Sequence, residues 1–158
     1  MSILIDKRDI INIAVKIEEN GEKFYREAAE KVASSEIKEL LTVLAKDEVK
    51  HKEIFMNMLK DLNISTDGLT TEYQNYLKAY TERLIFQTSP SDFLEKMKNF
   101  DQLWALEFAI QRELDSILYY YELKNIVRTT EHSLIDKIVA EERLHFEKLS
   151  KIRNILSN

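Results

Sequence analysis

The sequence has few of the residues that make turns and none that makes disulfides. Its 158 residues include two glycines, one proline and no cysteine, while 44% are hydrophobic and 32% are charged. A chain without cysteine forms neither a disulfide scaffold nor a thiolate metal site. The scarcity of glycine and proline argues against a β-sandwich and a glycine-rich phosphate-binding loop, and favours long helices. At this length we expect one domain, residues 1–158.

Blocks of positive charge and long apolar runs are also missing. The formal net charge is −5, and the lysines and arginines are dispersed among acidic residues, so we expect no nucleic-acid partner. No apolar run approaches the roughly 20 residues of a membrane span, and the apolar patch at residues 3–5 is too short for a signal-peptide core. We therefore expect a cytoplasmic protein without a membrane partner, and the absence of cysteine is consistent with a reducing compartment.

Apolar residues recur at helical spacing in four long segments. These segments are residues 9–33, 36–62, 101–127 and 131–156. At 1.5 Å per residue each is on the order of 38 Å long, and rods of that length pack side by side. The predicted fold class is all-α, a four-helix bundle made of two helical hairpins, residues 9–62 and 101–156.

A long connection, residues 63–100, separates the two hairpins. It contains a weaker helical stretch from Thr71 to Phe86 and a short one after Pro90, where Ser91 is the expected N-cap. A partly helical crossover of this length allows the second and third long helices to run parallel.

The two hairpins repeat one another. An offset of 95 residues relates Glu18 to Glu113 and Tyr25 to Tyr120. An offset of 94 relates Glu48 to Glu142 and His51 to His145. The repeat indicates two hairpins of one design that face each other.

Ionisable residues interrupt the apolar stripe of every long helix. The glutamates in phase with the stripes are Glu18, Glu48, Glu113 and Glu142, and two of them are followed three residues later by a histidine, His51 and His145. The third histidine, His132, has Thr129 three places before it and is out of phase with His145. We therefore predict that His132 lies on the surface.

These inward-facing residues need compensation. A buried, unpaired carboxylate costs several kcal/mol even after the surrounding protein relaxes. No lysine or arginine lies in phase with the apolar stripes beside the six residues. Four carboxylates and two neutral imidazoles carry −4, which two divalent cations offset. Oxygen ligands mixed with imidazole suit iron or manganese, with zinc as an alternative, and the arrangement matches a carboxylate-bridged two-metal site. A metal-free buried polar network is the other interpretation.

These motifs resemble the rubrerythrin branch of the ferritin-like superfamily. The matching stretches are residues 18–25, 47–51, 113–120 and 141–145, which together span most of the chain. The resemblance implies a ferritin-like bundle that holds two non-haem iron ions bridged by Glu48 and Glu142. It also implies that Glu18 and Glu113 are terminal ligands and that His51 and His145 each bind one ion.

The resemblance assigns supporting roles as well. Tyr25 and Tyr120 are similar to tyrosines that hydrogen-bond ligand carboxylates, with core packing as the alternative. Asp47 and Glu141 are candidates to hold the far nitrogens of the histidines, with surface positions as the alternative. The small residues Gly21 and Ser116 are expected to leave room for dioxygen or peroxide beside the metals.

The sequence departs from rubrerythrins in two respects. It contains no cysteine, hence no rubredoxin domain, which implies an external electron donor such as a rubredoxin-type protein. Rubrerythrins also carry a second carboxylate on the third long helix, where this chain has Ser116. That change brings the predicted ligand set closer to a bacterioferritin ferroxidase centre.

The function implied by the resemblance is reduction of hydrogen peroxide or dioxygen at a di-iron site. The alternatives are a ferritin-type ferroxidase or iron-binding shell, a di-iron oxygenase whose organic substrate enters along residues 63–100, and a structural bundle without metal. We expect a homodimer or a larger homo-oligomer, and because the two hairpins are alike, chains could exchange them.

Overall fold

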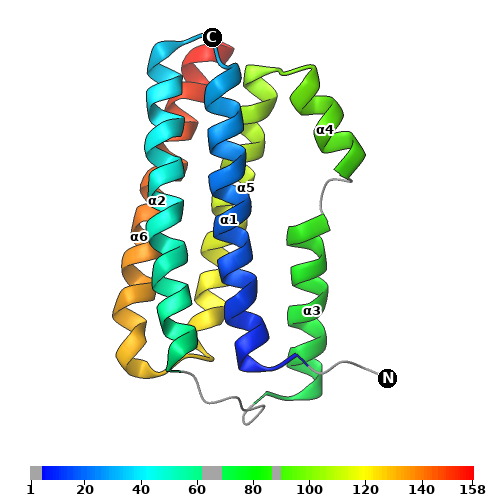
Figure 1. The fold of residues 1–158 in the computed structure, drawn as a ribbon, viewed down its shortest axis with the longest axis vertical. Helices are drawn as coiled ribbons and strands as arrows, with labels where there is room; N and C mark the ends of the chain where they lie inside the picture. Colours follow the sequence, from blue (N-terminus) through cyan, green and yellow to red (C-terminus); the bar gives the residue numbers. More distant parts are fainter. Residues whose placement is uncertain (1–4, 62–68, 87–89) are drawn as a thin grey trace.

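The computed structural model describes residues 5–61, 69–86 and 90–158. Four long helices form a bundle (Figure 1), namely α1 (Lys7–Lys31), α2 (Ser35–Lys60), α5 (Gln102–Lys124) and α6 (His132–Ser157). The other described elements are α3 (Thr71–Phe86), α4 (Pro90–Lys98) and the short 3-10 turn η1 (Thr129–Glu131). The predicted all-α four-helix bundle is confirmed. Within these three described ranges, no helix combines the length and apolar character needed to cross a membrane.

The long helices alternate in direction within each hairpin. In Figure 1, α1 and α6 rise while α2 and α5 descend, so the second and third long helices are parallel, as the long crossover predicts. The main packing is within each hairpin, α1 on α2 and α5 on α6, and contacts of α1 with α5 and of α2 with α6 close the bundle. The crossover helices α3 and α4 follow one another along the side of the bundle.

The helix ends differ from the predicted ones by up to three residues, for local reasons. The side chain of Asp6 accepts from the N–H of Asp9 and that of Asp9 accepts from the N–H of Asp6, so α1 begins at Lys7 rather than at residue 9. The C-terminal end of α5 also differs, because this helix stops at Lys124 rather than at residue 127. The next N–H groups bond to carbonyls three residues back, which tightens the chain out of the α-helix.

The start of α4 corrects one prediction. The helix begins at Pro90, so Ser91, the expected N-cap, lies inside it. Proline suits the first helical position because its ring presets φ and because an N–H there would have no helical partner. Residues 87–89 lie outside the described part of the chain.

Two apolar clusters fill the bundle, one toward each end. The first contains Ile10 and Phe55 together with Leu77 of α3. The second contains Leu44 together with Met97 of α4. Leu77 is 0% exposed and Met97 is 4% exposed, so each crossover helix is anchored in the core by a buried apolar side chain. The ionisable residues of the apolar stripes lie between the two clusters.

Candidate metal centre

Six ionisable side chains meet in the middle of the bundle. Each is at most 5% exposed; they are Glu18 of α1, Glu48 and His51 of α2, Glu113 of α5, and Glu142 and His145 of α6. The spacing of three residues places the glutamate and the histidine of α2, and likewise of α6, on one helix face. The structure thus brings together all six residues predicted as ligands. His132 is the first residue of α6, half-buried and outside this cluster.

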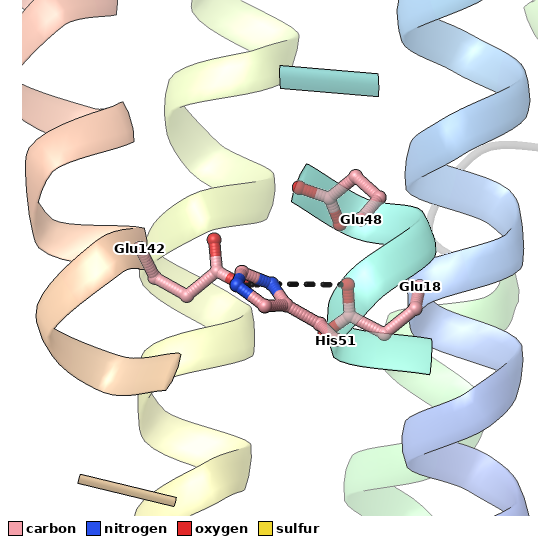
Figure 2. Close-up of side chains that lie close together, drawn as sticks. All are labelled: Glu18, Glu48, His51 and Glu142. Atoms are coloured by element: carbon pink, nitrogen blue, oxygen red, sulfur yellow. Dashed lines mark ion pairs between the residues drawn. The ribbon is translucent and has the colours of Figure 1, made fainter. Parts of the chain in front are cut away.

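The six side chains form two overlapping donor sets. The first is Glu18, Glu48, His51 and Glu142, and the second is Glu48, Glu113, Glu142 and His145. Within each set, one ligand atom per residue lies within 4.8 Å of every other. Figure 2 shows the first set converging from α1, α2 and α6 on one point. Glu48 and Glu142 belong to both sets, which is the arrangement that a shared pair of ligands between two ions requires.

Both histidines turn the same ring nitrogen inward. His51 Nδ1 lies 2.9 Å from Glu142 Oε1, and His145 Nδ1 lies 3.0 Å from Glu142 Oε2. The outer nitrogens meet carboxylates from the opposite helix, His51 Nε2 at 2.7 Å from Glu141 Oε2 and His145 Nε2 at 3.3 Å from Asp47 Oδ2. Asp47 and Glu141 therefore hold the far nitrogens, crosswise between α2 and α6, and leave both Nδ1 atoms facing the cluster.

Tyr25 and Tyr120, two of the buried tyrosines, reach across the bundle in the same reciprocal way. Tyr25 of α1 donates its hydroxyl hydrogen bond to Glu113 of α5, and Tyr120 of α5 donates to Glu18 of α1. Burial, and after it the charge of the accepting glutamate, raises the pKa of each phenol well above its ordinary value. Both hydroxyls therefore stay protonated donors that hold the two glutamates in place.

The structure shows what lies beside each of the two small residues that were expected to leave room for an oxygen species. A Cβ built on Gly21 would lie 2.7 Å from Glu48 Oε2, so the Glu48 carboxylate already occupies the space that the glycine provides. Ser116 is buried and its hydroxyl donates to the Arg112 carbonyl at 2.9 Å. The serine hydroxyl is thus bonded within its own helix.

Protonation balances the charge of the cluster in the absence of cations. Burial, followed by the nearby charge of Glu113, raises the pKa of Glu142 to about 8. Burial alone would lower the histidine pKa values, but the adjacent carboxylates raise that of His51 to about 11 and that of His145 to about 10. The neutral imidazoles that were assumed when two divalent cations were matched to four carboxylates therefore apply to the metal-bound state. Cations must displace protons from these side chains in order to bind.

The donor atoms of the cluster fit a pair of cations. Four of them, Glu18 Oε2, Glu48 Oε1, His51 Nδ1 and Glu142 Oε1, are buried and make no hydrogen bond of normal geometry, although His51 Nδ1 and Glu142 Oε1 lie 2.9 Å apart as an ion pair. Unpaired buried polar atoms are costly, and here they gather at one point. Carboxylate oxygens with imidazole nitrogens are ligands that iron, manganese and zinc accept. A cation in each donor set satisfies these atoms.

Comparison with known proteins agrees with this geometry. The family model for rubrerythrin matches residues 9–153. The chain belongs to the rubrerythrin family. Its fold is also similar to the crystal structure of a Thermotoga maritima protein described as a ferritin-like diiron-carboxylate protein, with a TM-score of 0.73, 29% sequence identity and coverage of 98% of both chains. No curated protein matches the sequence. The bundle of this rubrerythrin-family chain is therefore ferritin-like, as the resemblance implies.

Sequence reasoning missed one residue that ties the site together. Arg112 of α5 donates from Nη2 to the main-chain carbonyl of Ile17 of α1 at 3.1 Å. Arg112 directly precedes Glu113, and Ile17 directly precedes Glu18, so the bond fixes the spacing of the two helices beside both glutamates. The arginine next to an inward-facing glutamate is the signal that could have identified it.

Proposed function

We propose that this rubrerythrin-family protein is a non-haem di-iron redox protein that reduces hydrogen peroxide or dioxygen with electrons from an external donor. The observation that carries the proposal is the pair of donor sets that share Glu48 and Glu142. The family match and the description of the Thermotoga maritima relative as a diiron-carboxylate protein support it. Such an activity would serve protection against oxidative stress.

Each side chain has a defined part in holding the metals. Glu48 and Glu142 would bridge the two ions, with Glu18 and His51 completing one site, and Glu113 and His145 completing the other. When bound, an iron pair supplies electrons to the oxygen species at neutral pH. Manganese and zinc fit the same donors, but zinc offers no redox chemistry.

The surrounding residues keep the ligands in place and water away. Glu141 and Asp47 fix the ring orientation of His51 and His145 through their outer nitrogens. Tyr25 and Tyr120 orient the two terminal glutamates. The apolar clusters on either side limit the access of solvent, which strengthens every charge interaction inside.

The electrons must come from outside these 158 residues, because they contain no cysteine and hence no rubredoxin-type iron site. A rubredoxin-type protein is a suitable donor. A reducing compartment such as the cytoplasm is where such a donor works, and a homodimer or larger homo-oligomer is the expected assembly.

The test is anaerobic loading with Fe(II), followed by one equivalent of hydrogen peroxide. We expect two iron ions per chain, loss of the peroxide, and the near-ultraviolet absorbance of an oxidised iron pair. The proposal would be overturned if the loaded protein consumed no peroxide and if neither peroxide nor dioxygen oxidised its iron. His132→Ala is the control, because His132 lies outside both donor sets and should leave every readout unchanged.

A ferritin-type ferroxidase is the second candidate. The Ser116 hydroxyl bonds to its own helix and adds no seventh ligand to the six, so the site lacks the additional carboxylate expected of a rubrerythrin. A large closed shell on native sizing, with iron uptake far beyond two ions per chain, would favour this function. A small oligomer that stops at two ions per chain would favour the peroxide or dioxygen reductase.

A further inference from the structure

A row of tyrosine rings joins the metal centre to the outer face of α3. This row, the tyrosine chain, consists of Tyr120, Tyr119, Tyr80, Tyr76 and Tyr73. Ring centroids are 6.2 Å apart from Tyr120 to Tyr119 and 5.9 Å apart from Tyr119 to Tyr80. The next two steps, to Tyr76 and then to Tyr73, are 6.1 Å each. At the inner end, the Tyr120 hydroxyl bonds to Glu18.

Burial decreases along the tyrosine chain from Tyr120 to Tyr76, whereas Tyr73, the last ring, is half-buried. Tyr120 and Tyr119 are 0% exposed, Tyr80 is half-buried, and Tyr76 is 47% exposed. The chain thus passes from the core of α5 to the solvent side of α3. Electron tunnelling weakens steeply with distance, and closely spaced aromatic rings divide one long step into several short ones. The buried centre therefore has a stepwise path to the surface.

The hydroxyl partners distinguish the middle of the chain from its outer end. Tyr119 and Tyr80 donate to main-chain carbonyls, at 2.7 Å and 3.0 Å respectively. A carbonyl is too weak a base to take the proton that a phenol sheds on oxidation. Tyr73 instead donates to Glu122 Oε2 at 2.7 Å, and a carboxylate accepts that proton readily. An oxidising equivalent is therefore not held at Tyr119 and is stabilised at Tyr73, where a carboxylate accepts the proton.

A second aromatic row provides an internal comparison. It runs from Tyr25 to Phe24, Phe108 and Trp104, with centroid distances of 5.5, 4.9 and 5.4 Å. Phenylalanine is much harder to oxidise than tyrosine, so this row is interrupted at Phe24 and Phe108. Of the two rows, the tyrosine chain alone is made of oxidisable rings throughout.

Dioxygen reduction at the proposed site requires more electrons than an iron pair holds. Complete reduction to two waters takes four electrons and four protons, and the passage of two ferrous ions to the ferric state covers two of the electrons. Hydrogen peroxide takes two electrons, which the same pair covers entirely. A source of two further electrons is therefore needed with dioxygen and not with peroxide.

We propose that the tyrosine chain supplies these two electrons and moves the oxidising equivalents to Tyr73 and Tyr76, where a small one-electron reductant restores them. This inference rests on the proposed function. Tyr73 loses one electron inward and its proton to Glu122. Tyr76, whose hydroxyl lies 3.5 Å from the other oxygen of the same carboxylate, loses one electron inward and its proton to solvent. Two ferrous ions, two phenols, one dioxygen and two net protons from solvent thus give two waters, two ferric ions and two phenoxyl radicals. Ascorbate then returns one electron and one proton to each radical.

The experiment locates the radical in the iron-loaded, full-length chain. Wild type, Tyr80→Phe and Trp104→Phe are loaded anaerobically with two Fe(II) per chain and mixed with oxygenated buffer containing a nitroso spin trap. Peptides from residues 71–86 are analysed by mass spectrometry, and freeze-quenched samples by electron paramagnetic resonance. We expect a tyrosyl signal and trap adducts on Tyr73 or Tyr76 in wild type and in Trp104→Phe. In Tyr80→Phe we expect loss of the adducts on α3 with unchanged iron binding.

Two further samples make the test decisive. Wild type oxidised anaerobically with one equivalent of hydrogen peroxide should carry no adduct on α3. Tyr76→Phe, a change at an exposed position, should leave Tyr73 without adduct even if Tyr80→Phe does not fold. Adducts on Tyr73 that persist in both tyrosine variants overturn the chain. The tyrosine chain is also overturned if iron in the wild type is oxidised normally, no adduct forms and peroxide is released. That outcome leaves the proposed function intact. If neither dioxygen nor hydrogen peroxide oxidises the iron, the proposed function itself is wrong.

Discussion

Gly21 of α1 lies directly against the carboxylate of Glu48 of α2. A Cβ at this glycine would come within 2.7 Å of Glu48 Oε2 and 3.2 Å of its Cδ. Because Glu48 belongs to both donor sets, the absence of a side chain at Gly21 sets the position of a carboxylate that both proposed ions share. A glycine inside a helix costs up to about 1 kcal/mol relative to alanine, and this close approach is the physical reason for its presence.

The substitution Gly21→Ala should weaken metal binding without destabilising the helix. The new methyl group displaces the Glu48 carboxylate, and we expect metal affinity to fall by about tenfold to a hundredfold, as when a residue that positions a ligand is changed. The free energy of unfolding of the metal-free protein should stay level or rise by up to about 1 kcal/mol. Calorimetric titration with Mn(II) and chemical denaturation measure the two effects. Glu19→Ala, at an exposed position of the same helix, is the control, and wild-type affinity in Gly21→Ala would contradict the prediction.

Removal of His51 should reduce the number of bound metal ions from two to one per chain. His51 is the only histidine of the first donor set, and His51→Ala also leaves Glu18 without its imidazole partner and Glu142 with His145 alone. Loss of one member of a buried pair costs about 3–5 kcal/mol, so the metal-free variant should unfold at lower denaturant concentration. Elemental analysis after gel filtration gives the metal count. His132→Ala should keep two ions and wild-type stability, and two tightly bound ions in His51→Ala would refute the assignment.

The four long helices and the six inward-facing residues could be predicted because both depend on local spacing. Residues three and four apart share a helix face whatever the partner helix is, so Glu48 and His51 had to point the same way. Helix ends were less accessible, since the capping interaction of Asp6 with Asp9 moves the start of α1 by two residues. Pro90 likewise displaced Ser91 from the cap of α4.

Contacts between helices could not be derived from spacing. The sequence indicated Asp47 and Glu141 as supports for the histidines, but their crosswise pairing between α2 and α6 depends on how the two helices pack. Gly21 was expected to leave space for an oxygen species, whereas the approach of α2 fills that space with Glu48. The stacking of Tyr80 on Tyr119 depends on how the crossover docks on the bundle.

The metal-free protein should lose stability as the pH rises. A histidine whose pKa is raised on folding contributes its full stabilisation below the unfolded value of 6.5 and loses it as the pH climbs through the folded value. The folded values are about 11 for His51 and about 10 for His145. The pKa of Glu142, raised from 4.5 to about 8, acts in the same direction, because its carboxyl group is favoured in the protonated form.

Denaturation of the chelated protein at several pH values between about 6 and about 9 measures this slope. We expect the midpoint to fall steadily over the range. The Mn(II)-loaded protein should show the opposite trend, since protons compete with the ions for the same atoms. A midpoint that rises with pH in the metal-free protein would show that the buried histidines are neutral.

Metal removal should lower the melting temperature, because it leaves four glutamates buried together at the centre of the bundle. A ligand at about a hundred times its dissociation constant stabilises the folded state by about 2.7 kcal/mol, and for a domain of this size each kcal/mol corresponds to roughly 2–4 °C. We therefore expect Mn(II) to raise the melting temperature of the chelated protein by about 5–10 °C or more. The same addition should shift His51→Ala less, because one donor set is incomplete, and should shift His132→Ala as much as wild type. Superimposed melting curves with and without Mn(II) would instead favour the metal-free polar network, in which protonated His51 and His145, together with the protonated carboxyl group of Glu142, offset the charge of the glutamates.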